Sequence, residues 1–207
     1  MVSRLERRIG LLGGTFDPPH IGHVVVGVWA HHMLALDEVR LVVANDPWQK
    51  TRASTVTPAG VRLSMVEAAV AGIEGLVASA MEIERGGSSY MVETLEALHE
   101  REPDADLFVI LGADAAAGLP TWHRWEDLPA LATFVLVDRP GALARTSETP
   151  FAFEHLEVPR LDVTSTLLRS LVGRGAPVDG LVPAPVSSLI RERGLYRGEV
   201  HERPTAL

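Results

Sequence analysis

One short segment near the start of the sequence gathers residue types that could bind a phosphate ester. It reads Gly13-Gly14-Thr15-Phe16-Asp17-Pro18-Pro19-His20-Ile21-Gly22-His23. Adjacent glycines allow a turn and a close approach of the backbone to a ligand. Two imidazoles three residues apart at the start of a helix can face the same ligand, and the helix itself offers free N–H groups and a positive dipole end to an anion. The segment therefore predicts phosphate binding.

The two histidines alone leave other interpretations open. An isolated His-x-x-His pair is equally typical of a helix cap beside a solvated side chain. A zinc site would need further ligands, and although His31 and His32 follow along the same helix, the sequence has no Cys and no His-Glu-x-x-His pattern. Walker and Gly-x-Gly-x-x-Gly patterns are also absent from this segment. We predict no metal held by protein ligands, and packing or surface roles for His31 and His32.

A second candidate phosphate-binding segment lies far along the chain and reads Val163-Thr164-Ser165-Thr166-Leu167-Leu168-Arg169. We expect Ser165 and Thr166 to cap a helix whose first N–H groups bind phosphate, with the Arg169 guanidinium one turn further on. Taken alone, this pattern is more typical of an ordinary helix start with a solvated arginine. Its combination with the His20 and His23 segment favours a shared anionic ligand.

Composition restricts the classes of partner and the location. The 207 residues include 27 acidic and 19 basic side chains, for a formal net charge of −8, and Lys50 is the only lysine. This balance argues against sequence-independent binding of nucleic acid. No apolar run approaches the roughly 18 residues that a membrane span requires. The absence of Cys and the charged start, MVSRLERR, favour a cytoplasmic protein.

Short β-rich runs alternate with helical periods along the chain, which predicts an α/β fold with a Rossmann-like, doubly wound parallel sheet. Strands are expected at 8–12, 39–44, 76–80, 106–111, 133–137 and 155–158, and helices over 21–36, 58–71, 89–101, around 113–128, 165–172 and 183–193. Thr57 and Pro58 resemble an N-cap and a first helical residue, and Gly72 a helix end. We expect one domain over 1–207, with a core over about 8–162 and a small C-terminal helical addition over about 163–195.

Both segments resemble motifs of the nucleotidylyltransferase superfamily. Residues 13–23 are similar to its GGTFDPxHxGH stretch, with Pro19 at the variable position. The HIGH tetrapeptide also occurs in class I aminoacyl-tRNA synthetases, whose second motif is a Lys-rich KMSKS loop. Residues 163–169 resemble instead the ISSTxxR stretch of the nucleotidylyltransferases.

Four further segments narrow the resemblance to the bacterial nicotinate mononucleotide adenylyltransferases, over most of residues 8–193. They are 47–50 (PWQK), 85–90 (RGGSSY), 112–114 (GAD) with 121–125 (TWHRW), and 139–141 (RPG). The resemblance implies transfer of AMP from ATP to nicotinate mononucleotide in NAD biosynthesis, which yields nicotinate adenine dinucleotide and pyrophosphate. It implies Mg²⁺ carried mainly by the ATP phosphates, and ATP and a pyridine mononucleotide as the partners, without nucleic acid or membrane. Whether the chain forms a homo-oligomer is left open.

The resemblance also implies roles for particular residues. The catalytic set comprises His20, His23, Lys50 and Arg169. The ATP-binding set comprises Gly14, Thr15, Phe16, Gly22, Gly112, Asp114, Ser165 and Thr166. The acceptor-binding set comprises Ser89, Tyr90, Trp122 and His123. Within these sets, Gly112 and Asp114 would meet the adenosine ribose and Trp122 would stack on the pyridine ring, while Trp125 packs.

Met91 departs from the family pattern. The family usually has a Thr after Tyr90, near the pyridine carboxylate, and a thioether cannot replace a hydroxyl as a hydrogen-bond donor. Nicotinamide mononucleotide, or another phosphorylated acceptor such as phosphopantetheine, therefore stays open as the acceptor. A nucleotide-binding paralogue without catalytic activity is a separate alternative.

Overall fold

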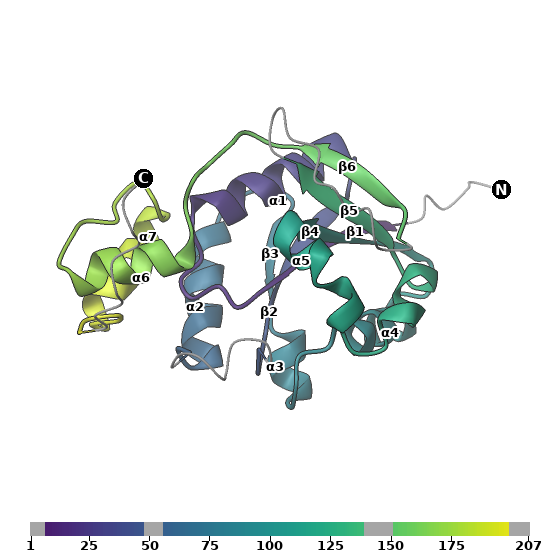
Figure 1. Cartoon of the computed structure of the whole chain (residues 1–207), viewed down its shortest axis with the longest axis horizontal. Coiled ribbons are helices and arrows are strands. Elements are labelled where there is room, and N and C mark those ends of the chain that lie inside the picture. Colours follow the sequence, from purple (N-terminus) through teal and green to yellow (C-terminus); the bar gives the residue numbers. More distant parts are fainter. Residues whose placement is uncertain (1–6, 48–55, 139–150, 199–207) are drawn as a thin grey trace.

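The computed structural model describes residues 7–47, 56–138 and 151–198. Six parallel strands form one sheet in the order β3-β2-β1-β4-β5-β6 (Figure 1). The strands are β1 (Arg7–Gly14), β2 (Glu38–Val43), β3 (Leu76–Ser79), β4 (Ala105–Gly112), β5 (Thr133–Asp138) and β6 (Phe153–Glu157). Because strand order reverses between β1 and β4, the carboxyl ends of these two strands flank the crevice where ligands bind in open α/β sheets. The predicted doubly wound parallel sheet is confirmed.

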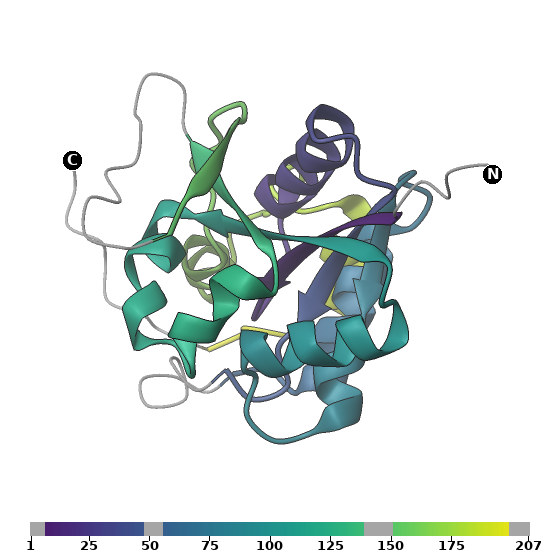
Figure 2. The same cartoon turned by 90° about the vertical axis from the view of Figure 1, so that its right-hand side faces the viewer.

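Helices cover both faces of this sheet. They are α1 (Ile21–Met33), α2 (Ala59–Val70), α3 (Met81–Arg85), α4 (Met91–Arg101), α5 (Ala113–Ala117), α6 (Ser165–Gly173) and α7 (Ala184–Glu192), with 3₁₀ turns η1 (Leu119–Thr121) and η2 (Trp125–Ala130). Figure 2 shows α1 and α4 on opposite faces of the sheet. The C-terminal helices α6 and α7 lie to one side, where α7 contacts α2 (Figure 1).

The central strands are buried on both faces, as a parallel sheet requires. Along β4, Phe108 and Ile110 join the apolar cluster that packs under α1, α2, α6 and α7. Leu107, Val109 and Leu111 join the cluster on the opposite face, under α4 and the two 3₁₀ turns. Because successive side chains of a strand point to opposite faces of the sheet, β4 contributes to two separate cores.

The boundaries of several elements differ from expectation. The first strand continues to Gly14, and the first helix ends at Met33, with Ala35 beyond its C-cap at φ +48°. The helix expected around 113–128 is divided into α5, η1 and η2, with Arg124 in the left-handed region at φ +50°. The short helix α3 was not predicted, since the strand pattern of 76–80 runs directly into it.

The start of α2 corrects a predicted cap. Pro58 is the N-cap and Ala59 the first helical residue, so Thr57 does not cap the helix. The Thr57 backbone is used elsewhere: its N–H donates to Asp17 and its carbonyl accepts from Arg62. Gly72 follows the C-cap of α2 with φ +77°, as expected of a residue that ends a helix. Among the described residues, no helix is both long enough and apolar enough to cross a membrane.

Candidate active site

The loop after β1 carries the first predicted site residues to the crevice of the sheet. The strand ends at Gly14, where a Cβ would approach the Phe16 ring to 3.0 Å, so a larger residue would displace that ring. Phe16 itself is buried at φ +51° and lies edge-on to His23, with 4.9 Å between ring centroids. The turn therefore packs directly against one of the two histidines, and Gly14 permits that packing.

His20 and His23 are brought together at the start of α1. His20 is the N-cap, its backbone N–H donates to His23 Nδ1 over 3.1 Å, and the two rings stack with centroids 3.7 Å apart. Burial lowers the pKa of His20 from 6.5 to about 4. A Cβ at Gly22 would come within 3.0 Å of His20 Nδ1, so glycine leaves room for the ring. At neutral pH His20 is therefore an uncharged side chain.

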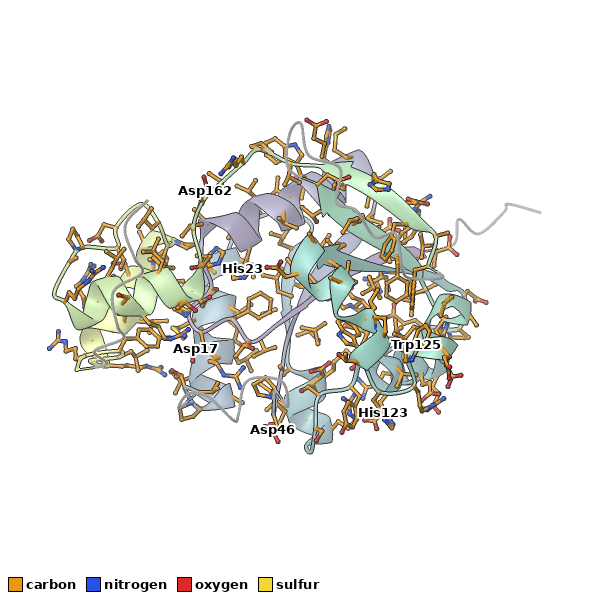
Figure 3. The ribbon with its side chains drawn as sticks, in the orientation of Figure 1. Asp17, His23, Asp46, His123, Trp125 and Asp162 are labelled. Carbon is orange, nitrogen blue, oxygen red and sulfur yellow. The ribbon has the colours of Figure 1, made fainter. Side chains whose placement is uncertain are left out.

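The second motif meets this loop through α6. Ser165 Oγ donates to the Pro18 carbonyl over 2.8 Å, and Arg169 Nη1 donates to the Asp17 carbonyl over 2.7 Å. Figure 3 shows Asp17 and His23 between the sheet and α6. Two segments separated by about 150 residues thus lie in contact, as a ligand shared between them requires.

The cap of α6 differs from the prediction. Thr164, not Ser165 or Thr166, is the N-cap, and its Oγ1 accepts from the Leu167 N–H over 3.1 Å. Ser165 and Thr166 are the first two helical residues. Because the Thr164 hydroxyl caps the helix, the Ser165 hydroxyl can donate to the Pro18 carbonyl.

A cavity of about 490 Å³ opens beside the loop after β1. It is lined by Gly13, Gly14, Thr15, Ala44, Pro47, Glu82, Ser89, Tyr90, Met91, Leu111, Asp114, Ala115, Trp122 and His123. Every residue of the predicted acceptor-binding set is included. From the predicted ATP-binding set the lining includes Gly14, Thr15 and Asp114. The rest of that set, together with the histidine pair and Arg169, lies outside the cavity lining.

One wall of the cavity is formed by the start of α4 and the segment after α5. The Tyr90 and His123 rings lie 4.4 Å apart between centroids. Trp122 and Trp125 both pack against the apolar cluster on this face of the sheet; Trp122 also lines the cavity, and the Trp125 ring lies 6.2 Å from the Phe151 ring between centroids. A Cβ at Gly13 would be 3.1 Å from the Met91 methyl group. Met91 therefore reaches across the cavity toward the end of β1.

Glu82 is a cavity residue that sequence reasoning missed. It is 4% exposed, belongs to the unpredicted helix α3, and accepts a 2.8 Å hydrogen bond from Thr94 Oγ1. Arg85 Nη1 donates to the same hydroxyl over 3.1 Å. The signal in the sequence is an acidic residue among apolar neighbours. It can be interpreted once Met81–Arg85 is recognised as a helix.

Asp17 and Tyr196 form a further unpredicted pair behind the loop after β1. The Tyr196 hydroxyl donates to Asp17 Oδ1 over 2.6 Å, and the Thr57 N–H donates to Asp17 Oδ2 over 3.0 Å. Burial and the neighbouring carboxylate raise the pKa of Tyr196, which therefore stays protonated and donates. Asp17 is consequently a structural acceptor, held 5% exposed.

Lys50 lies outside the described residues, and so do residues 48–49 and 139–141 of the quoted segments. Within the described ranges, no three His, Asp or Glu side chains are grouped so that they could hold a metal ion. Among the described residues, the charged groups in contact with the histidine loop include Arg169 and the buried Arg62 and Asp17.

Comparison with known proteins identifies the family of the chain. The model of the family described as "Cytidylyltransferase-like" matches residues 11–171. A protein from Leifsonia xyli is 44% identical, with 95% of this chain and 98% of that protein covered. One from Mycolicibacterium vanbaalenii is 41% identical over 95% of both chains. Each carries the name "Probable nicotinate-nucleotide adenylyltransferase".

A solved structure has the same fold at low sequence identity. The nicotinic acid mononucleotide adenylyltransferase of Plasmodium falciparum, in complex with NaAD, superposes with a TM-score of 0.76 at 16% identity, covering 92% of this chain and 98% of that one. With the fold, the two joined motifs and relatives of about 40% identity over nearly the whole length, the chain belongs to the cytidylyltransferase-like family and, within it, to the nicotinate-nucleotide adenylyltransferases.

Proposed function

We propose that this protein transfers the adenylyl group of ATP to nicotinate mononucleotide, which forms nicotinate adenine dinucleotide and releases pyrophosphate. A phosphate oxygen of the mononucleotide attacks the α-phosphorus, and the bond from that phosphorus to the pyrophosphate oxygen breaks. The observation that carries the proposal is the contact of α6 with the histidine loop, through Arg169 to Asp17 and Ser165 to Pro18, beside a cavity of suitable size for a mononucleotide.

The chemistry requires little proton transfer from the protein, because the attacking phosphate is already ionised. Catalysis then depends on position and on donors directed at the charge that develops in the transition state. We assign His23 to the transferred α-phosphate and His20 to its positioning. In the protein without ATP, burial lowers the pKa of His20 to about 4, so His20 is uncharged before the phosphates bind. Positive charge at the phosphates would come from Arg169 and from Lys50, which lies outside the described residues.

We assign the cavity to the acceptor and to the sugar of ATP. Trp122 offers a flat ring for stacking against the pyridine, and Asp114 at the start of α5 can accept hydrogen bonds from ribose hydroxyls. Ser89, Tyr90 and His123 complete the acceptor wall. The remaining proposed nucleotide contacts lie in the loop after β1, at the starts of α1 and α6, and at the end of β4. They are Phe16, Gly22, Ser165, Thr166 and Gly112.

Mg²⁺ is the ion we expect with ATP. Asp17 is 5% exposed and accepts hydrogen bonds from Tyr196 and Thr57, and within the described ranges no group of three carboxylates or histidines is suited to hold a metal ion. The donor set fits an ion held by the phosphate oxygens of ATP, in keeping with the preference of Mg²⁺ for few protein ligands. When bound, the ion neutralises phosphate charge. The cytoplasmic setting and the absence of a nucleic-acid partner stay predictions, and the oligomeric state stays open.

The test is a side-by-side assay of pyrophosphate release from ATP and Mg²⁺ with three acceptors: nicotinate mononucleotide, nicotinamide mononucleotide and phosphopantetheine. We expect the highest kcat/KM with nicotinate mononucleotide. A preference for one of the other acceptors would replace the proposed substrate. ATP binding without pyrophosphate release for all three would instead identify a catalytically silent protein.

A further inference from the structure

Arg62, in the first turn of α2, is a fully buried cation that the proposed reaction does not use. It is 1% exposed. Its guanidinium donates to the carbonyls of Thr57, Thr15 and Asn45, over 2.7, 2.8 and 3.0 Å respectively. Burial lowers the pKa of Arg62, an effect that the Asp17 carboxylate opposes. A planar group with several fixed donors is therefore employed to hold three separate backbone segments at one point.

Two of these carbonyls, those of Thr15 and Asn45, lie just beyond the ends of β1 and β2. Beyond the registered pairs of β1 and β2, the Ala44 N–H donates to the Gly14 carbonyl over 3.0 Å. Beyond this bond the segments that follow β1 and β2 separate. Thr15 enters the loop that leads to His20, while Asn45 turns toward residues 87–90. Arg62 donates to the next carbonyl along each segment, that of Thr15 and that of Asn45, where direct hydrogen bonding between the strands has ended.

The Asn45 branch continues to the acceptor side of the cavity. The Asn45 N–H donates to Ser89 Oγ and its Nδ2 donates to the Gly87 carbonyl, both over 2.8 Å. The Ser89 N–H returns a 3.2 Å bond to the Asp46 carbonyl. Ser89 and the adjoining Tyr90 line the cavity. Arg62 is thus linked through Asn45 to the proposed acceptor wall, and through Thr15 to the proposed phosphate loop.

We propose that Arg62 is a positioning residue that sets the separation of the two substrates. The inference rests on the proposed function, and Arg62 acts through Thr15 and Asn45 without touching either substrate. In-line transfer needs the attacking oxygen about 3 to 3.5 Å from the phosphorus. If Arg62 is altered, each loop keeps its own contacts with its own ligand, but the distance between the loops is no longer fixed. The chemical step should suffer more than the binding of either substrate.

The dinucleotide product provides a direct measure of that separation. Its two halves are covalently joined, so its affinity depends on both subsites lying at the correct distance, in the way that a bivalent ligand depends on the span between its sites. A mononucleotide bound alone has no such dependence. Isothermal titration calorimetry with three ligands, namely a non-hydrolysable ATP analogue, nicotinate mononucleotide and nicotinate adenine dinucleotide, separates positioning from general loss of structure.

The principal variant is Arg62→Lys, which keeps the charge beside Asp17 but cannot direct fixed planar donors to three carbonyls. We expect its Kd for the dinucleotide to rise about tenfold and its kcat to fall about tenfold, with less than about threefold change in the Kd of either mononucleotide ligand. Val66→Ala is the matched control. Val66 is buried one turn further along α2 in the apolar core, so this variant should lose thermal stability without selective loss of dinucleotide affinity.

Asn45→Ala is a second variant that leaves the buried cation in place. It removes the side-chain bond to Gly87, one link further along the same path, and we expect a selective weakening of dinucleotide binding of about threefold. Equal changes in all three affinities in folded Arg62→Lys and Asn45→Ala proteins, or unchanged dinucleotide affinity, would overturn the assignment of Arg62. Failure of the wild-type protein to form or bind the dinucleotide would instead refute the proposed function.

Discussion

The histidine loop and the cavity beside it are built in opposite ways. The loop of residues 15–20 is held by polar contacts from segments that are distant in sequence, namely Arg62, Ser165, Arg169 and Tyr196, and Asp17 to His20 are buried. The cavity is lined mainly by apolar surface from Met91, Leu111, Ala115 and Trp122. Position is fixed in the first region by hydrogen bonds, while the second provides shape and stacking surface. We therefore expect the phosphate half of the site to determine rate and the cavity to determine acceptor choice.

The variant His23→Ala is the strongest test of the expectation that the phosphate half of the site determines rate. Loss of a donor at the transferred phosphate should lower kcat by about 100-fold or more, with a small effect on the KM of the acceptor. Steady-state kinetics with both substrates varied measures this. A folded variant with near-normal kcat would show that the histidine pair is not part of the catalytic group.

Arg169→Ala should have a similar effect on kcat, also about 100-fold, because it removes a cation from the phosphates. It also removes the 2.7 Å bond to the Asp17 carbonyl. Arg169→Lys separates these roles, since it keeps charge but not the planar donor group. Partial recovery of kcat in the lysine variant is the expected result, and full activity in the alanine variant would contradict the assignment.

On the cavity side, Trp122→Ala should raise the KM of the mononucleotide acceptor by about tenfold, through loss of ring stacking and buried area. The KM of ATP should change little. Trp125→Ala is the matched comparison, because Trp125 packs near Phe151. It should reduce stability and leave the acceptor KM unaltered. The reverse outcome would exchange the roles of the two tryptophans.

A smaller effect is expected from Met91→Thr, which introduces a hydroxyl donor at the start of α4. A donor to the pyridine carboxylate should raise the preference for nicotinate over nicotinamide mononucleotide by several-fold, which corresponds to about 1 kcal/mol. The ratio of kcat/KM for the two acceptors measures the change. If the ratio is unaltered, Met91 does not contact the group that distinguishes these acceptors.

The last prediction concerns stability toward acid, not catalysis, and follows from His20. Its pKa is lowered from 6.5 to about 4 in the folded protein. The unfolded chain therefore binds a proton at a pH where the native chain does not. This contribution to stability is complete above about pH 6.5 and declines as the pH falls toward 4, by up to about 3 kcal/mol. His20→Gln should flatten the pH dependence of urea unfolding in this window, and an unchanged slope would contradict it.

The sequence predicts the sheet well because strand and helix patterns extend over enough residues to show their periods. Helix α3 is five residues long, too short to display one. The predicted cap of α6, Ser165 and Thr166, lies one and two residues beyond the actual N-cap, Thr164, because Ser and Thr are chemically similar at an N-cap. Helices, strands and their order follow from side-chain pattern, whereas the exact cap depends on which hydroxyl finds another acceptor.

In the site, residue types with distinctive chemistry could be identified from their motifs. His20, His23 and Arg169 are of this kind, and the structure brings their segments together. Arg62 could not be identified, because its partners are backbone carbonyls, which have no signature in the sequence. An arginine on a helix is ordinarily solvated. Only the fold reveals that this one is enclosed by three loops.

The pair formed by Asp17 and Tyr196 has a consequence for how the protein is made. Residues 15–18 are synthesised well before Ser165, Arg169 and Tyr196, which are three of their hydrogen-bond partners. On the ribosome, the sheet strands β1 to β5 can assemble while these partners are still inside the exit tunnel or not yet translated. The phosphate loop therefore acquires its full set of contacts only after residue 196 has emerged, and we expect a nascent chain to become active only once α6 and Tyr196 have docked.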